Sequence, residues 1–202
     1  MKALIAFATG LLAAAPAFGV TIVYTTSLSG PNENPPIASP GIGVATVTVD
    51  TTAHTLRVQE TFSGLTSGTT ASHIHCCNPP PATSGVATMT PTFSGLPLGV
   101  TLGSMDQTFD TLATSTYNAP FVTANGGTAA GAEAALFTGL AAGTAYLNIH
   151  TTQNLGGEIR GFLTVAAPVP EPETYALFLA GLASLGVAAR RHHHREAARR
   201  GD

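Results

Sequence analysis

The residues with the clearest chemical potential lie in the segment Ser72-His73-Ile74-His75-Cys76-Cys77. It contains both cysteines of the 202-residue chain and two of its seven histidines. Side chains alternate between the two faces of a β-strand, so His73 and His75 would share one face and Ile74 would lie on the other. A His-X-His pair joined by a third, distant histidine is a frame for zinc or copper.

An internal repeat supplies the third histidine. Residues 62–75 (FSGLTSGTTASHIH) align without a gap with residues 137–150 (FTGLAAGTAYLNIH), so that His75 matches His150. We interpret each copy as a strand end at the phenylalanine, a glycine-rich connection and a new strand that ends in histidine. His73, His75 and His150 would then converge on copper or zinc, with Glu158 or Cys77 as a possible fourth ligand. The alternative is a structural polar cluster in which each imidazole hydrogen-bonds backbone groups.

The adjacent cysteines have several possible states. In an oxidising compartment a disulfide is expected, but neighbouring side chains on a strand point apart, so a bond between Cys76 and Cys77 needs a local turn. The following segment, Asn78-Pro79-Pro80-Pro81, ends the strand and permits such a turn. We predict a disulfide within the pair. An intermolecular bond, free thiols and metal ligation remain open.

Alternating apolar and polar residues predict the strands that position these side chains. Candidate strands cover residues 21–29, 43–50, 54–62 and 157–165, and the polar connection between the second and third predicts a hairpin. Residues 30–41 are rich in proline and glycine and read as a loop, whereas residues 130–140 are the helical candidate. Few charges, abundant threonine, glycine and valine, and no tryptophan favour an all-β domain. We expect antiparallel strands in two packed sheets with at most one or two short helices.

Charge and motif content restrict the function. Between residues 20 and 167 the basic residues are Arg57 and Arg160, against seven acidic residues, which argues against nucleic-acid binding. The sequence contains no Gly-X-Ser-X-Gly elbow, phosphate loop or His-Glu-X-X-His motif. We therefore expect a non-enzymatic binding or structural module. The alternative is a copper- or zinc-binding protein, with or without redox activity, although the four histidines of residues 20–167 are too few for a two-metal site of the superoxide dismutase type.

The two ends of the chain carry export signals. Residues 1–19 have a lysine before an apolar run, which is typical of a signal peptide cleaved after Ala17 or Gly19. Residues 20–167 would form one domain. In residues 168–202 an acidic, proline-rich spacer precedes an uncharged stretch, 174–189, and a basic tail, 190–202. That stretch predicts an apolar helix that spans the membrane marginally, with its tail in the cytoplasm. The tail histidines 192–194 are interpreted as solvated residues.

The C-terminal arrangement resembles the PEP-CTERM sorting signal of Gram-negative bacteria. The resemblance rests on Pro170-Glu171-Pro172, the apolar stretch, and Arg190 with Arg191. It implies processing by an exosortase-type system at the inner membrane. The precursor would be anchored there transiently and then delivered to the periplasm, the cell surface or the extracellular space.

Residues 25–165 resemble the CHRD domain, which occurs in many bacterial secreted proteins. The resemblance is carried by LSGPNENPPIASPGIGVATVTVD, by FSGL followed by SHIH, and by YLNIHTTQNLGGEIRG. Ser72 stands where the family usually has alanine, and the Cys76-Cys77 pair is outside its general pattern. The resemblance implies an immunoglobulin-like antiparallel β-sandwich but no agreed activity and no catalytic residues. An exopolysaccharide or another envelope protein is a possible partner of such a module.

Overall fold

The structure is a computed structural model that describes residues 21–167, 177, 179–182, 184 and 185. The chain divides into two compact units, residues 1–166 and 167–202, which are treated separately. The strands of the first unit are β1 (Thr21–Ser29), β2 (Ile42–Asp50), β3 (Thr55–Ser63), β4 (Thr69–His75), β5 (Gly103–Asp110), β6 (Tyr146–Thr151), β7 (Ile159–Phe162) and β8 (Thr164–Val165). Its helices are α1 (Ala119–Ala124) and α2 (Ala129–Ala141), with the 3-10 turns η1 (Gly30–Asn32) and η2 (Thr114–Thr116).

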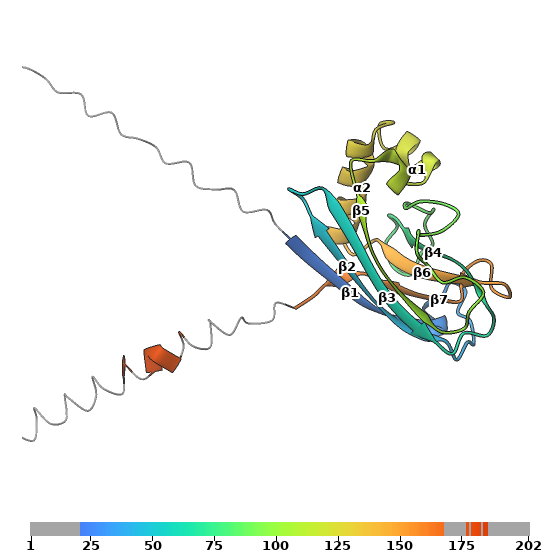
Figure 1. The fold of residues 1–202 in the computed structure, drawn as a ribbon, viewed down its shortest axis with the longest axis horizontal. Helices are drawn as coiled ribbons and strands as arrows, with labels where there is room; N and C mark the ends of the chain where they lie inside the picture. Colours follow the sequence, from blue (N-terminus) through green and yellow to red (C-terminus); the bar gives the residue numbers. More distant parts are fainter. Residues whose placement is uncertain (1–20, 168–176, 178, 183, 186–202) are drawn as a thin grey trace, which may run out of the picture. The chain divides into compact units, whose positions relative to one another are not determined.

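All strands pair antiparallel in one continuous sheet with the order β4-β6-β7-β1-β2-β3-β5, and β8 pairs with β1 (Figure 1). Strand β1 pairs with β2 along its whole length, and its other edge meets β7 at Arg160 and β8 at Val165. The all-β prediction is therefore confirmed, together with its two short α-helices. The two predicted packed sheets are two parts of a single sheet, because β1 is hydrogen-bonded on both edges.

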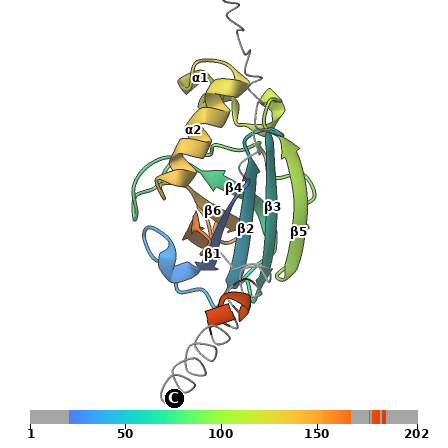
Figure 2. The same ribbon diagram turned by 90° about the vertical axis from the view of Figure 1, so that its left-hand side faces the viewer.

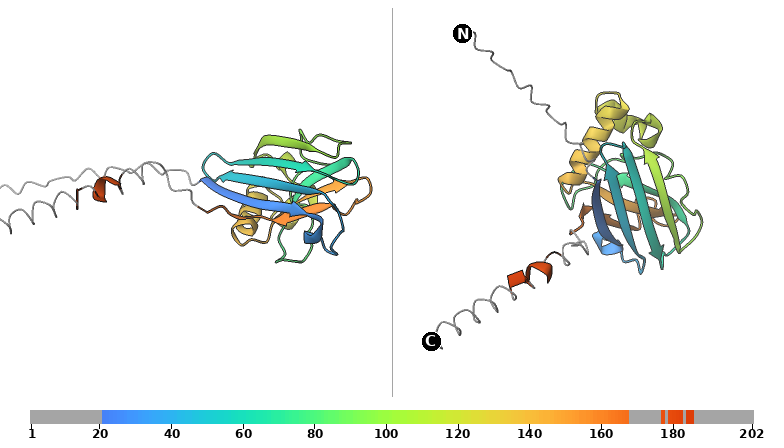
Figure 3. Two further views of the ribbon diagram at one scale, coloured as in Figure 1. Left: turned by 90° about the horizontal axis from the view of Figure 1, so that it is seen from below. Right: turned by 60° about the vertical axis from the view of Figure 1, so that its left-hand side comes forward.

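The sheet folds back on itself into two layers with the hydrophobic core between them (Figure 3). One layer contributes Val47, Val49, Leu56 and Val58 from β2 and β3, and the other contributes Ile74, Leu147, Ile149 and Ile159 from β4, β6 and β7. All eight side chains are 0–1% exposed. Helices α1 and α2 lie together at one end of the strands (Figure 2). Burial of these branched side chains is the main contribution to the stability of the domain.

The predicted hairpin of residues 43–50 and 54–62 is present as β2 and β3, with Ile42 opposite Ser63 and Asp50 opposite Thr55. The candidate strand 157–165 is divided into β7 and β8 at Leu163. The backbone N–H of Leu163 donates to Ala145 O (2.9 Å), which extends the β6–β7 register by one residue beyond the end of β7. The side chain of Leu163 is fully buried. Strands β7 and β8 keep the same register on β1, with Arg160 opposite Ser29 and Thr164 opposite Thr25, so the predicted strand continues across Leu163.

The two copies of the repeat differ in their first halves. Phe62 lies at the end of strand β3, as predicted, but Phe137 lies inside helix α2, so our strand interpretation of the second copy is wrong there. The alanine-rich run 129–141 has a high helix propensity, and the Thr128 side chain accepts a hydrogen bond from the Gly131 N–H (3.1 Å) at its start. The second halves are both strands, β4 and β6, and these carry the histidines.

The outer faces of the two layers differ in their exposure to solvent. Strand β2 alternates between buried and more exposed residues, because its outer face meets solvent. Every residue of β6 is buried, because the outer face of the β4-β6-β7 layer is covered by loops. That covered face holds polar side chains: His73 and His75 of β4, Tyr146, Asn148 and His150 of β6, and Arg160 of β7. A buried polar face of this kind needs internal partners for each group.

In the second unit residues 177, 179–182, 184 and 185 are helical, and their leucines are exposed. No helix within the described residues is long and apolar enough to cross a membrane. The signal peptide, the Pro170-Glu171-Pro172 spacer, Arg190 and Arg191 lie outside the described residues.

Candidate metal centre

The pairing of β4 with β6 brings the three histidines together. His73 lies opposite Asn148, and His75 lies opposite Tyr146. The ring centroids are 5.3 Å apart for His73 and His150, 5.7 Å for His75 and His150, and 6.0 Å for His73 and His75. His73 is slightly nearer to His150 than His75 is, because His150 pairs opposite Ala71 and is diagonal to His73 across the ladder.

Each imidazole has one nitrogen bonded to a backbone carbonyl. His73 Nε2 lies 2.8 Å from Pro91 O, His75 Nδ1 lies 2.9 Å from Ser84 O, and His150 Nδ1 lies 2.9 Å from Leu155 O. A carbonyl oxygen only accepts hydrogen bonds, so these three nitrogens carry the protons. The opposite nitrogens, His73 Nδ1, His75 Nε2 and His150 Nε2, are then unprotonated in the neutral rings.

The unprotonated nitrogens are buried and have no hydrogen-bond partner in the structure. One ring nitrogen of each histidine lies within 4.8 Å of those of the other two. Tetrahedral or trigonal ligands at 2.0–2.1 Å from a metal are separated by about 3.3–3.6 Å, so side-chain shifts of about 1 Å would close the group around an ion. Three unprotonated imidazole nitrogens in one buried cluster are suited to binding a cation.

The environment keeps the rings neutral. Burial lowers the pKa of His73 to about 4, with a further contribution from His150. Burial also lowers the pKa of His75 to about 4 and lowers the pKa of His150, and in both cases the backbone hydrogen bond partly opposes the shift. Neutral imidazole is the form that ligates metals, so the site is ready for a metal at neutral pH without losing protons.

Neither predicted fourth ligand lies in this group. The carboxylate of Glu158 accepts hydrogen bonds from Ser39 Oγ, Thr66 N and Thr151 Oγ1, each at 2.6 Å. These bonds hold it away from the imidazoles, because Thr151 follows His150 and points to the opposite face of β6. Cys77 is disulfide-bonded to Cys76. Its Sγ lies near Ala135 of helix α2, 3.8 Å from the carbonyl oxygen.

A set of residues that sequence reasoning did not assign to the site lies beside it. The Tyr146 ring is stacked on His75. The Arg160 guanidinium lies 4.8 Å from the ring centroid of Tyr146 and 5.7 Å from that of Phe162. Arg160 donates to Asn32 O (2.6 Å) and Pro81 O (2.9 Å). It thereby fastens two covering loops over the layer. The alternation of YLNIH places Tyr146 beside His150, but no local signal marks Arg160 as buried.

Arg160 also has a buried counter-ion. Its Nε lies 3.7 Å from Glu33 Oε2, and the two side chains are 1% and 6% exposed. Burial raises the pKa of Glu33 to about 7, although the positive charge of Arg160 acts in the opposite direction. A buried charge needs a partner of this kind, so the pair links the loop after β1 to β7.

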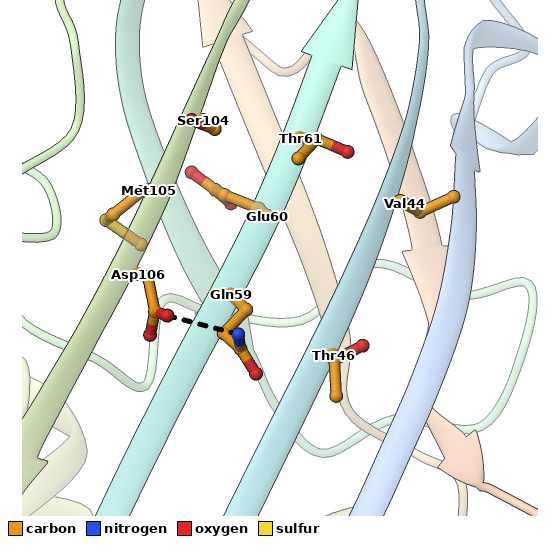
Figure 4. A pocket seen from close by; sticks show the side chains of 8 residues that line it. All are labelled: Val44, Thr46, Gln59, Glu60, Thr61, Ser104, Met105 and Asp106. Atoms are coloured by element: carbon orange, nitrogen blue, oxygen red, sulfur yellow. Dashed lines mark hydrogen bonds between the residues drawn. The ribbon is translucent and has the colours of Figure 1, made fainter.

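The outer face of β2, β3 and β5 carries a different, shallow depression (Figure 4). It is lined by the outward-facing Val44, Thr46, Gln59, Thr61, Ser104 and Asp106, and by Glu60 and Met105, whose side chains are buried (1% and 5% exposed). Asp106 is held there by Gln59 Nε2 (3.1 Å) and by two hydrogen bonds from Arg57 (2.7 and 2.6 Å).

Across the part of the chain that the structure describes, His73, His75 and His150 form the group suited to a metal.

Comparison with known families places this geometry in context. The model of the CHRD domain matches residues 24–163, which is more than half of the chain. The chain belongs to the CHRD domain family. The model of the PEP-CTERM protein-sorting motif matches residues 168–191. No curated protein and no solved structure matches the chain.

The CHRD match spans the β domain from β1 to Leu163 and includes all three histidines. The sorting motif follows it directly, starting at residue 168. This combination is that of an exported protein which an exosortase-type system sorts to the cell envelope. Both predicted resemblances are confirmed.

Proposed function

We propose that this chain is a non-enzymatic envelope protein whose CHRD domain binds one copper or zinc ion through His73, His75 and His150. The observation that supports this proposal is that three neighbouring buried histidines each have one ring nitrogen without a hydrogen-bond partner. Imidazole nitrogen suits both metals. The carbonyls of Pro91, Ser84 and Leu155 would act as the outer partners that orient the ligands, as is usual for metal-bound histidine.

A purely structural polar cluster accounts less well for these contacts. In such a cluster the imidazoles would donate with one nitrogen and accept with the other, and both atoms would be satisfied. Here all three acceptor nitrogens lack donors. Each buried acceptor without a donor costs about 1–3 kcal/mol, and a single cation offsets the cost of all three at once.

The binding test must exclude the C-terminal histidines. The full chain carrying H192A/H193A/H194A is incubated with copper or zinc, dialysed, and analysed for metal content. We expect one equivalent of metal in this background and less than a tenth of that in the His75→Gln and His150→Gln variants. His54→Asn is the matched control, since His54 pairs with Glu133 (3.0 Å) away from the cluster and asparagine tolerates its positive φ of 52°. A background protein that stays free of metal would contradict the proposal, whatever the stability of the two glutamine variants.

We also propose that the apolar stretch 174–189 anchors the precursor in the inner membrane until the exosortase-type system processes it. The sorting motif over residues 168–191 and the arginines that follow the apolar stretch support this. Cells expressing the full chain and a chain ending at Ala167 are fractionated. The full chain should be found in the membrane fraction before processing, and the shorter chain in the periplasm. Recovery of both in the periplasm would contradict the anchor.

A further inference from the structure

The donor set of the three-histidine centre bears on which ion it selects. We infer that the centre is selective for monovalent copper, Cu⁺, over Zn²⁺ and Cu²⁺. This inference rests on the proposed metal-binding function and adds the charge and identity of the ion. It follows from the charge of the ligands, their number, and their burial.

The first argument is charge. All three ligands are neutral imidazoles, and the group contains no carboxylate or thiolate. The nearby carboxylates are used elsewhere: Glu158 accepts from Ser39, Thr66 and Thr151, and Glu33 is beside Arg160. The cost of burying an ion rises with the square of its charge when no ligand neutralises it. Burial in this site therefore costs a monovalent ion much less hydration free energy than it costs a divalent ion.

A fixed positive charge close to the centre strengthens this preference. Arg160 lies over the Tyr146 ring at 4.8 Å, and Tyr146 is stacked on His75 with centroids 4.8 Å apart. The guanidinium is thus separated from a metal ligand by one aromatic ring. Glu33, 3.7 Å from Arg160 Nε, balances part of this charge, and the remainder repels a divalent ion at His75 more strongly than a monovalent one.

The second argument is coordination number. Zinc in proteins is almost always four-coordinate, and it needs a fourth ligand from protein or solvent. The Tyr146 hydroxyl is engaged with the Ser84 backbone (3.1 and 3.3 Å), and Cys77 is disulfide-bonded. Asn148 Oδ1 is buried without a partner on the same face, but a neutral amide oxygen is a hard donor that adds no charge. Cu⁺, a closed-shell d¹⁰ ion, is satisfied by three nitrogens in a plane.

The third argument is burial. His73, His75 and His150 are 6%, 8% and 9% exposed, because the segments that carry Ser84, Pro91 and Leu155 cover them. A solvent ligand, which Zn²⁺ or Cu²⁺ would need to complete its coordination, therefore has restricted access. A three-coordinate ion suits this enclosure.

The experiment compares three ions on one protein. The full chain with H192A/H193A/H194A is titrated under argon with Cu⁺ supplied as its acetonitrile complex, in competition with a chromogenic Cu⁺ chelator. Zn²⁺ and Cu²⁺ are titrated in parallel against their own chelators. Thiol and phosphine reductants are left out, because reduction of Cys76–Cys77 would create thiolates that bind Cu⁺ themselves. We expect one equivalent of Cu⁺, bound at least about tenfold more tightly than either divalent ion, a difference that chelator competition resolves.

Two further readouts make the result specific to the centre. X-ray absorption of the Cu⁺-loaded protein should give three nitrogen neighbours and no sulfur. His150→Gln should weaken Cu⁺ binding at least about 100-fold, whereas His54→Asn should leave it unchanged. The X-ray absorption result uses the unaltered site, so it decides the question even where a variant fails to fold.

The outcomes separate this inference from the function on which it rests. Zn²⁺ or Cu²⁺ binding as tight as Cu⁺ binding, or four or more ligands around Cu⁺, overturns the selectivity and leaves the proposed function standing. Absence of binding for all three ions overturns both. Unchanged Cu⁺ affinity in a folded His150→Gln variant also overturns both, because the ion would then lie elsewhere.

Discussion

The ring of Tyr146 is stacked on the imidazole of His75, with centroids 4.8 Å apart and 8° between the ring planes. Both side chains also contact the backbone of Ser84: His75 Nδ1 lies 2.9 Å from Ser84 O, and Ser84 N donates to the Tyr146 hydroxyl at 3.1 Å. The two residues pair across β4 and β6. Tyr146 therefore fixes the orientation of His75 without being a ligand itself.

Replacement of Tyr146 tests this positioning role. Tyr146→Leu removes the stack and the hydroxyl, and it should weaken metal binding about 10–100-fold while one equivalent still binds. Tyr146→Phe retains the stack, so most of the affinity should return. Equal affinities of wild type and Tyr146→Leu, measured by chelator competition, would show that the stack does not position His75.

Removal of Arg160 should destabilise the domain strongly. Arg160→Met leaves the Glu33 carboxylate buried and takes the donors from Asn32 O and Pro81 O, at a cost of about 3–5 kcal/mol in the free energy of unfolding. Urea denaturation measures the loss. The Glu33→Gln/Arg160→Met double variant should recover part of it, because no lone charge is then buried. Arg57→Met is the control, since the Arg57–Asp106 pair is half exposed and should matter little.

Glu60 should make the stability of the domain depend on pH. It lies in the core, 1% exposed, with Ser72 Oγ donating to it at 2.8 Å, and burial raises its pKa to about 7 from the ordinary 4.5. The folded state then holds this proton more tightly than the unfolded state, so the contribution is present below pH 4.5 and is lost as pH rises through 7. Glu60→Gln should gain roughly 3 kcal/mol relative to wild type between pH 4.5 and 8. An equal difference between the two proteins at both pH values, in urea denaturation, would refute the shift.

Gly139 of α2 should not tolerate a side chain. Glycine to alanine in a helix normally stabilises by about 1 kcal/mol, but a Cβ here would meet Cys76 Sγ and come within 2.7 Å of Cys77 Sγ. We expect Gly139→Ala to destabilise the domain by about 1–3 kcal/mol. In a Cys76→Ala/Cys77→Ala background, Gly139→Ala should stabilise the domain by the amount that is usual for this substitution in a helix. Thermal unfolding of the four proteins gives the coupling directly, and zero coupling would argue against the contact.

The histidine cluster of the metal-free protein should resist protonation. The pKa values of His73 and His75 are lowered to about 4, and that of His150 is also lowered, because burial disfavours the charged rings. Metal affinity should therefore be nearly constant from pH 8 to about 5 and fall below that, where protons compete for the ligand nitrogens. NMR titration of the ring C–H signals provides the measurement. A midpoint near 6.5 for any of the three would contradict this environment.

Local patterns in the sequence were sufficient to predict β1, the β2–β3 hairpin and helix α2, because period-2 alternation and helix propensity act over a few neighbouring residues. The same alternation put His73 and His75 on one face of a strand. The repeat indicated His150 as their partner, although its first half was read wrongly in the second copy, where alanine-rich residues form α2 instead of a strand.

The sequence by itself determined the family, the strands other than β5 (Gly103–Asp110), and the identity of the three histidines. Only the tertiary structure decided that β6 lies between β4 and β7, which sets His150 diagonal to His73 and puts Tyr146 against His75. It also decided that Glu158 bonds Thr151, away from the imidazoles, and that distant loops supply the carbonyls of Ser84 and Pro91. Strand order and loop cover are settled by which arrangement pairs all buried backbone groups and encloses the core. That condition involves residues far apart in the chain, so strand order and loop cover cannot be predicted from local periodicity.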